Sequence, residues 1–218
     1  MSKKVTKSAP TLEEAFGKLT NGEKRTELAK DITVEDVYGF IQNNERKRIS
    51  KFVYERFYRR YLMPFEKVDK DFNSGFAQMA ACCLMIEAMQ SFRNGWKSTY
   101  RLKDANGKEI PGGKIFGDFF KHYSEFVDFE NLGFEFYDSI RCGILHQAET
   151  KNGWIVMRDG PLFDEPTRTI NSTIFRRQME KCLNKYCKEL QADDIVWDDF
   201  KEKMAYVIVN CHGDEMKS

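Results

Sequence analysis

Residues 75–94 read GFAQMAACCLMIEAMQSFRN, and this stretch decides the fold class. Between Phe76 and Phe92 the only charged residue is Glu87, and Gly95 follows as a helix stop signal. A helix that is apolar on nearly all sides is stable only when other elements surround it. The stretch therefore predicts a mainly α-helical protein, a helical bundle with this segment at its centre.

Helical periodicity continues on both sides of the central segment. Apolar residues recur every three or four positions, which predicts a long helix over 34–63, a helix over 115–129, one that starts after 131, one over 172–190, and a last helix near the C-terminus. Polar residues stand where they can cap these helices and a short one near the N-terminus: Thr11, Thr33, Asn73 or Ser74, Asn131, Ser172, and Asp193 or Asp194.

The stretch from residue 154 to 170 has a different pattern. Trp154–Met157 and Thr167–Ile170 are strand candidates, with an Asp-Gly-Pro turn signal at 159–161. We therefore expect a small β-hairpin insertion in the helical bundle. No linker divides the rest of the chain, so we expect a partly flexible N-terminal extension over 1–32 and a single helical domain over 33–218.

Composition excludes several classes of protein. Hydrophobic residues make up 41% of the 218 residues and charged residues 32%, which is typical of a globular chain, and 18 Phe predict an aromatic core. The net charge of +1 gives no overall field that would attract nucleic acid, so RNA binding would need a local basic patch. The most apolar run, 76–89, is too short to span a bilayer, so we expect no membrane partner.

The cysteines and histidines indicate neither a disulfide framework nor a metal site. The six cysteines include no C-x-x-C pair, and the three histidines show no ligand spacing. The first residues, MSKKVTKSAPTLEE, lack the apolar core of a signal peptide. We expect free thiols, a reducing cytoplasm, and no metal or other cofactor.

One basic residue lies on an apolar helix face. Residues 134–150 read FEFYDSIRCGILHQAET, and Arg141 falls inside the arc of apolar side chains. A guanidinium keeps its charge when buried, so it needs a partner or a polar cleft. Glu87 on the central helix is likewise a charged residue among apolar ones, and a Glu87–Arg141 ion pair would give each charge its partner. Such a pair fits a purely structural role, or one in which Glu87 orients an arginine that binds phosphate.

The second polar residue of this segment is His146. On an uninterrupted helix Arg141 and His146 would point about 140° apart. A bend near Gly143, a helix end, or a second chain across a two-fold axis would be needed to bring them together. A lone histidine is more often structural than catalytic, and the spacing alone is not specific.

The context of this spacing resembles a known family. Arg141-x4-His146 on an apolar helix resembles the R-x(4–6)-H signature of the HEPN ribonucleases (higher eukaryote and prokaryote nucleotide-binding domains). IRCGILHQAET at 140–150, with NGW at 152–154, and CCLMIEAMQSFRNGW at 82–96 are similar to a group of uncharacterised bacterial HEPN-like proteins. The resemblance covers about residues 74–190. The family often has Asn, Asp or His after the arginine, where this chain has Cys142, and a thiol is a poor polar substitute.

The resemblance implies a metal-independent endoribonuclease. The 2′-hydroxyl of RNA would attack the adjacent phosphate to give a 2′,3′-cyclic phosphate, with His146 moving protons and Arg141 holding the phosphate. Glu87, Cys142 and Gln147 would support them. HEPN domains typically form homodimers with a composite site, and such a ribonuclease could be a toxin or defence effector with an antitoxin partner.

Two basic segments are candidates for contact with RNA. Positive residues concentrate on the long helix, including Arg46, Arg48 and Lys51, and again at Arg176 and Arg177. The simpler interpretation of each cluster is an ordinary solvated helix face.

Three hypotheses remain open at this point. The first is the HEPN-type ribonuclease. The second is a non-catalytic HEPN-like module that binds nucleotide, RNA or a protein partner, which Cys142 and the small net charge favour. The third is a helical interaction protein in which Arg141 serves only as one member of a buried ion pair.

Overall fold

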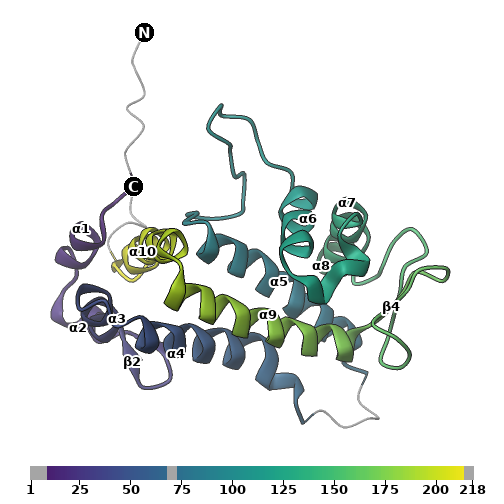
Figure 1. Ribbon diagram of the computed structural model, residues 1–218, viewed down its shortest axis with the longest axis horizontal. Helices are drawn as coiled ribbons and strands as arrows, with labels where there is room; N and C mark the ends of the chain where they lie inside the picture. The colour runs from purple at the N-terminus through teal and green to yellow at the C-terminus, as the bar shows by residue number, and fades with distance from the viewer. Residues whose placement is uncertain (1–8, 68–72, 214–218) are drawn as a thin grey trace.

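The long helices of the computed structural model lie side by side along one axis (Figure 1). The structure describes residues 9–67 and 73–213; the predicted flexibility of the N-terminal extension before residue 9 lies outside the described residues. Helix α9 (Ser172–Ala192) packs against both α4 (Arg46–Phe57) and α5 (Gly75–Arg93), and α10 (Asp194–Val209) crosses one end of them. The mainly α-helical fold class predicted from the sequence is confirmed.

Helix α5 is buried as its sequence requires. Cys82, Cys83, Met85 and Ile86 have no exposed surface. Helices α9, α10 and α6 (Gly112–His122) all pack against it, while one face stays open, with Phe76 37% and Leu84 43% exposed. The apolar character of the packed faces follows from their place between the other helices.

A second group of elements contributes an aromatic core. Helix α6 is followed by a 3-10 helix (Ser124–Phe129) and by α7 (Gly133–Phe136), so the helix expected over 115–129 is interrupted after His122. Seven buried phenylalanine rings from these elements and α9 pack against one another, mostly edge-on or tilted, with Phe136 and Phe175 stacked: Phe116, Phe119, Phe120, Phe126, Phe129, Phe136 and Phe175. Each buried ring removes a large apolar area from water, which makes this cluster a main source of stability.

The long helix expected over 34–63 is divided into separate pieces. Helix α3 (Val34–Gln42) ends where Asn44 adopts a left-handed conformation with φ of 52°, and α4 begins two residues later. A π-helix (Tyr58–Leu62) and a 3-10 turn (Met63–Phe65) follow α4. Asparagine tolerates the left-handed region better than most residues, so the break falls at the Asn-Asn pair rather than at Gly39.

The helix caps agree with the sequence at three positions. Thr11 and Thr33 form reciprocal capping boxes at α1 (Leu12–Gly17) and α3, and the Asp193 side chain caps α10. Three other expected caps are wrong in detail. Ser74 occupies the N-cap position of α5, but its hydroxyl accepts a hydrogen bond from the Gln78 side chain instead of from the helix backbone. Leu132 occupies the N-cap position of α7 that was expected for Asn131. Asn171 caps α9 in place of Ser172.

The expected β-insertion is present, but its strands do not form the predicted hairpin. Strand β3 (Ile155–Met157) pairs in parallel with β5 (Thr169–Asn171), and β4 (Phe163–Asp164) pairs antiparallel with β5 on its other side. Parallel strands need a crossover, and residues 158–168 supply it. A short antiparallel pair near the N-terminus, β1 (Glu27–Ala29) with β2 (Ile32–Thr33), was not expected, because three- and two-residue strands leave no readable alternation. Helix α2 (Asn21–Lys24) precedes it.

No helix within the described residues has both the length and the apolar character needed to cross a membrane.

Helices α6 and α7 approach each other through two glycines. A Cβ atom on Gly133 would lie 2.5 Å from the Cα atom of Gly117, whereas a Cβ on Gly117 would lie 3.8 Å from the Cα of Gly133. The first distance is a clash with backbone and the second is an ordinary contact.

This asymmetry predicts opposite effects of the same substitution. Gly133→Ala should lower the free energy of unfolding by about 1–3 kcal/mol, because the backbones must separate. Gly117→Ala should leave stability equal or slightly higher, since alanine favours the helix. Denaturant unfolding of both variants measures the difference, and equal effects would contradict the close approach.

Candidate functional site

A π-helix carries the arginine of interest. The chain runs from α7 through a π-helix (Tyr137–Cys142) into α8 (Gly143–Gln147) without leaving helical conformation. A π turn closes over five residues instead of four, so it rotates the residues that follow relative to a continuous α-helix. Leu145, which follows the π-helix, is exposed, whereas Phe136 and Ile140 are buried; Phe134 at the start of the segment is exposed as well.

Arg141 and His146 are neighbours within one chain. The Nη1 atom of Arg141 lies 3.1 Å from the Nε2 atom of His146. The π-helix precedes this contact, and α8 ends just after it at Ala148, which has a left-handed conformation. An interrupted helix and a nearby helix end therefore produce the proximity that a continuous helix would have prevented.

The expected ion pair between Glu87 and Arg141 is present. Glu87 projects from α5, and its Oε1 atom lies 2.9 Å from the Nε of Arg141. The two side chains are only 18% and 19% exposed, respectively. Burial by itself would lower the pKa of Arg141, but the hydrogen bond and charge of Glu87 outweigh it and raise that pKa above its ordinary value. The guanidinium is also 5.4 Å from the centre of the Tyr137 ring, so its position is determined on two sides.

The contact with arginine involves one ring nitrogen of His146. A guanidinium has only donors, so a hydrogen bond at this distance uses the Nε2 of His146 as its acceptor. A ring nitrogen that can accept a hydrogen bond is also a group that can take a proton from a hydroxyl group.

These groups lie in a cavity of about 490 Å³ between α5, α6, α8 and the loop that precedes α6. Thr99, Tyr100 and Arg101 from that loop line it, and the Tyr100 side chain is exposed. The sequence alone gave no reason to assign Thr99, Tyr100 or Arg101 to the site. The full lining is Glu87, Thr99, Tyr100, Arg101, Glu109, Ile110, Gly112, Ile115, Phe116, Tyr137, Arg141 and His146.

Gly112 allows an aromatic wall on this cavity. A Cβ atom at Gly112 would lie 2.2 Å from the Tyr137 ring, so only glycine lets the ring pack against the start of α6. Burial raises the pKa of Tyr137, an effect that the positive charge of Arg141 opposes. The Tyr137 hydroxyl therefore stays protonated near neutral pH.

Of the other two residues expected to support the site, Cys142 lies close to it and Gln147 does not. Cys142 is half-buried, and its charge would affect the pKa of both Tyr137 and Arg141, so it lies beside the pair. Gln147 is exposed and does not line the cavity. Within residues 9–67 and 73–213, no group of three or more histidine, cysteine, aspartate or glutamate side chains is placed to hold a metal ion.

The residues expected to bind RNA do not form one surface with the cavity. Arg46 pairs with Asp194 at 2.6 Å, and Arg48 pairs with Glu45 at 2.9 Å. Helix α4, which also carries the exposed Lys51, packs on α9 at the lower edge of Figure 1, whereas α6, α7 and α8 lie at the upper right.

The second expected basic cluster is divided between interior and surface. Arg176 is only 7% exposed because it faces the packed side of α9, so its assignment to an RNA surface is wrong; Arg177 is exposed.

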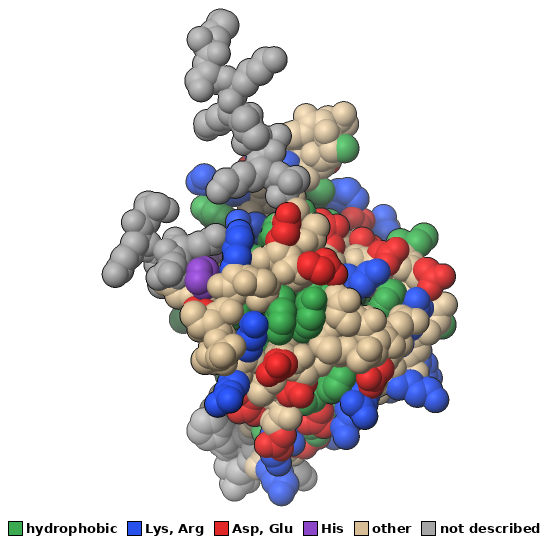
Figure 2. All heavy atoms as spheres, turned by 90° about the vertical axis from the view of Figure 1, so that its left-hand side faces the viewer, with side chains coloured by type: hydrophobic (Ala, Val, Ile, Leu, Met, Phe, Trp, Pro, Cys, Tyr) green, Lys and Arg blue, Asp and Glu red, His purple; other side chains and the backbone are tan. Residues whose placement is uncertain are grey.

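The face turned toward the viewer in Figure 2 mixes acidic and basic side chains, so no surface of a single sign dominates it.

Comparisons of the chain with protein-family models, with curated proteins and with solved structures found no match.

The ion pair predicts a measurable effect on stability. Glu87→Gln should lower the free energy of unfolding by about 1.5–3 kcal/mol, because it leaves the poorly solvated Arg141 without a charged partner. Glu55→Gln is the matched control: the Glu55–Arg59 pair at 2.6 Å is more exposed, and its loss should cost less than about 1 kcal/mol. Equal losses in denaturant unfolding would argue against a special role of the Glu87–Arg141 pair.

The end of α8 depends on a small residue. A Cβ atom at Gly143 would lie 2.5 Å from the carbonyl oxygen of Glu149, where the chain folds back over the helix. Gly143→Ala should therefore destabilise the protein by about 1–3 kcal/mol. Gly39→Ala, at a helical position with no atom within 4 Å, should be neutral or stabilising. Thermal unfolding distinguishes the two, and a neutral Gly143→Ala would show that the chain after α8 is free to move.

Proposed function

We propose that this protein is a metal-independent endoribonuclease of the HEPN type. One observation carries the proposal: the guanidinium of Arg141 and the imidazole of His146 lie 3.1 Å apart at a cavity of about 490 Å³. The cation can hold a phosphodiester, and the imidazole can take a proton from a neighbouring hydroxyl. RNA carries a phosphodiester and a 2′-hydroxyl side by side, so it offers one group to each of the two side chains.

The reaction begins with the 2′-hydroxyl. His146 Nε2 removes its proton as the 2′-oxygen bonds to phosphorus, and Arg141 moves from the imidazole to the phosphate oxygens, where negative charge develops. The bond from phosphorus to the 5′-oxygen then breaks. The leaving oxygen takes a proton from imidazolium or water, which leaves a 2′,3′-cyclic phosphate and a 5′-hydroxyl. No step needs an oxidant, a reductant or a metal.

The residues around the pair have distinct roles in this proposal. Glu87 holds the guanidinium through Nε, which leaves Nη1 directed toward His146 and toward an incoming phosphate. Tyr100 lies on the cavity wall and the residue is 75% exposed, so a base can stack on its ring. Arg101, whose guanidinium lies 5.2 Å from the Tyr100 ring, supplies a second cation for the backbone.

A second copy of the chain fits the same chemistry. One Arg141–His146 pair offers a single histidine, whereas cleavage uses a base and an acid. Two copies facing each other would place a second pair in the same groove, and the proton given to the leaving oxygen would then come from the second histidine. We propose a homodimer with a composite site on this ground.

The cellular role follows from the substrate. An endoribonuclease that needs no metal can act on the RNA of its own cell, so it suits a toxin or defence effector restrained by a protein antitoxin. The cytoplasm, expected from the cysteine pattern, is where such a target is available.

The test is cleavage of end-labelled single-stranded RNA in EDTA by wild type, His146→Ala and Arg141→Lys. We expect cleavage to a 2′,3′-cyclic phosphate, slowed by roughly 100-fold or more in His146→Ala, because a positioned base contributes about that much. His122→Ala is the matched control: this histidine pairs with Glu189 and does not line the cavity. It should cleave like wild type. A 2′-deoxy nucleotide at the cleaved position should abolish the reaction.

Two outcomes would overturn the proposal. Equal cleavage by wild type and by His146→Ala purified in parallel would identify a contaminating ribonuclease. RNA binding without cleavage, lost in Arg141→Ala, would support the non-catalytic binding module instead. His146 is exposed, so its replacement should not unfold the chain, and circular dichroism of the variant checks this.

A further inference from the structure

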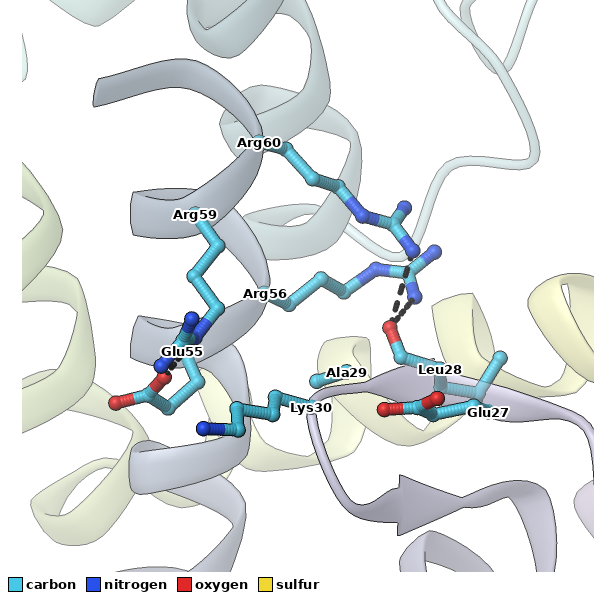
Figure 3. A pocket seen from close by; sticks show the side chains of 8 residues that line it. All are labelled: Glu27, Leu28, Ala29, Lys30, Glu55, Arg56, Arg59 and Arg60. Carbon is cyan, nitrogen blue, oxygen red and sulfur yellow. Dashed lines mark hydrogen bonds and ion pairs between the residues drawn. The ribbon is translucent and has the colours of Figure 1, made fainter. Parts of the chain in front are cut away.

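Two arginines, one in the last turn of α4 and one in the π-helix that follows it, donate to the same backbone oxygen. Arg56 Nη1 lies 2.6 Å and Arg60 Nη2 lies 3.0 Å from the carbonyl oxygen of Leu28 in β1. The two residues are four apart, so they lie on one helix face, and Figure 3 shows both guanidinium groups converging on that oxygen. Like charges repel, and a neutral carbonyl group compensates for only a small part of that repulsion.

The carboxylates nearby are occupied elsewhere. Glu55 pairs with Arg59 at 2.6 Å, and Glu27 accepts a hydrogen bond from the backbone of Asp31 at 2.7 Å. Within the part of the chain that the structure describes, Arg56 and Arg60 have no carboxylate at ion-pair distance. Their positive charge is therefore uncompensated.

Other observations show how strong this concentration of charge is. Burial, together with the charge of Arg60, lowers the pKa of Arg56 to about 10. Burial, together with the charge of Arg56, lowers the pKa of Lys203 on α10 to about 8. Arg60 also belongs to the π-helix Tyr58–Leu62, and π turns are rare and frequent at functional sites.

A cavity adjoins the two guanidinium groups. It has a volume of about 240 Å³ and is lined by Glu27, Leu28, Ala29, Lys30, Glu55, Arg56, Arg59 and Arg60. Four of these side chains are cationic and two are acidic, which leaves an excess of two positive charges. Each guanidinium has five N–H donors and gives one to Leu28, so most donors remain available.

We propose that this cavity binds a phosphate group, either as inorganic phosphate or as a small phosphate monoester. A tetrahedral dianion accepts hydrogen bonds from both guanidinium groups at once and relieves their mutual repulsion. Lys30 also lines the cavity, but its side chain extends toward Glu55 and Arg59 rather than toward the two converging guanidinium groups (Figure 3). The site is distinct from the Arg141–His146 cavity, with which it shares no lining residue.

The experiment is calorimetric titration of the full-length protein with inorganic phosphate and with glycerol 3-phosphate, at pH 7.5 and constant ionic strength. Arg60→Gln removes one of the two converging cations and should weaken binding at least tenfold. Arg48→Gln is the matched control, because it also removes one positive charge, but from α4 and outside the cavity. It should change the affinity less than twofold.

Each outcome decides the matter. Tighter binding of inorganic phosphate would identify a site for the free ion, and tighter binding of glycerol 3-phosphate a site for a phosphorylated small molecule. Equal weakening of phosphate binding by Arg60→Gln and Arg48→Gln would show only general charge attraction and would overturn the proposal. Chloride binding as tight as that of the tetrahedral anion sulfate would overturn it for the same reason. No binding of either phosphate by a folded wild-type protein would overturn it as well.

Discussion

The ion pair between Glu87 and Arg141 is the constraint on which the candidate site depends. An arginine does not lose its charge when it is buried, so an apolar helix that carries one needs a fixed anion within reach. The central helix supplies that anion at its only charged position between Phe76 and Phe92. The pair joins α5 to the helical segment that bears His146, and it orients the guanidinium by its Nε edge, which leaves the opposite edge for another ligand.

Local irregularities in the helices position both basic sites. The π-helix at Tyr137–Cys142 contains Arg141 and lies just before His146, and the π-helix at Tyr58–Leu62 contains Arg60. Gly112 and Gly143 then let the neighbouring ring and the returning chain approach closely. These features cost stability in an ordinary helix, and large apolar contacts elsewhere, above all the phenylalanine cluster, offset that cost.

Positive charge in this molecule is used in separate places rather than along one face. Some arginines of α4 are neutralised locally, as in the pairs Arg46–Asp194 and Arg48–Glu45. Arg176 is buried, and the pair at Arg56 and Arg60 stays uncompensated. This distribution shows that a chain of net charge +1 can still concentrate positive charge at one place, since a local excess needs no excess overall.

The sequence by itself determined the fold class, the buried central helix, several caps and the Glu87–Arg141 pair, because each depends on hydrophobic periodicity or on a charge that must be matched. It also placed the β-insertion, but not the parallel pairing of β3 with β5. Only the tertiary structure decided that Arg141 meets His146 in one chain, that Tyr100 and Arg101 line the same cavity, and that Arg176 is buried. These facts depend on a π turn, on loop placement and on which helix face is covered, and such long-range contacts leave no regular spacing in the chain.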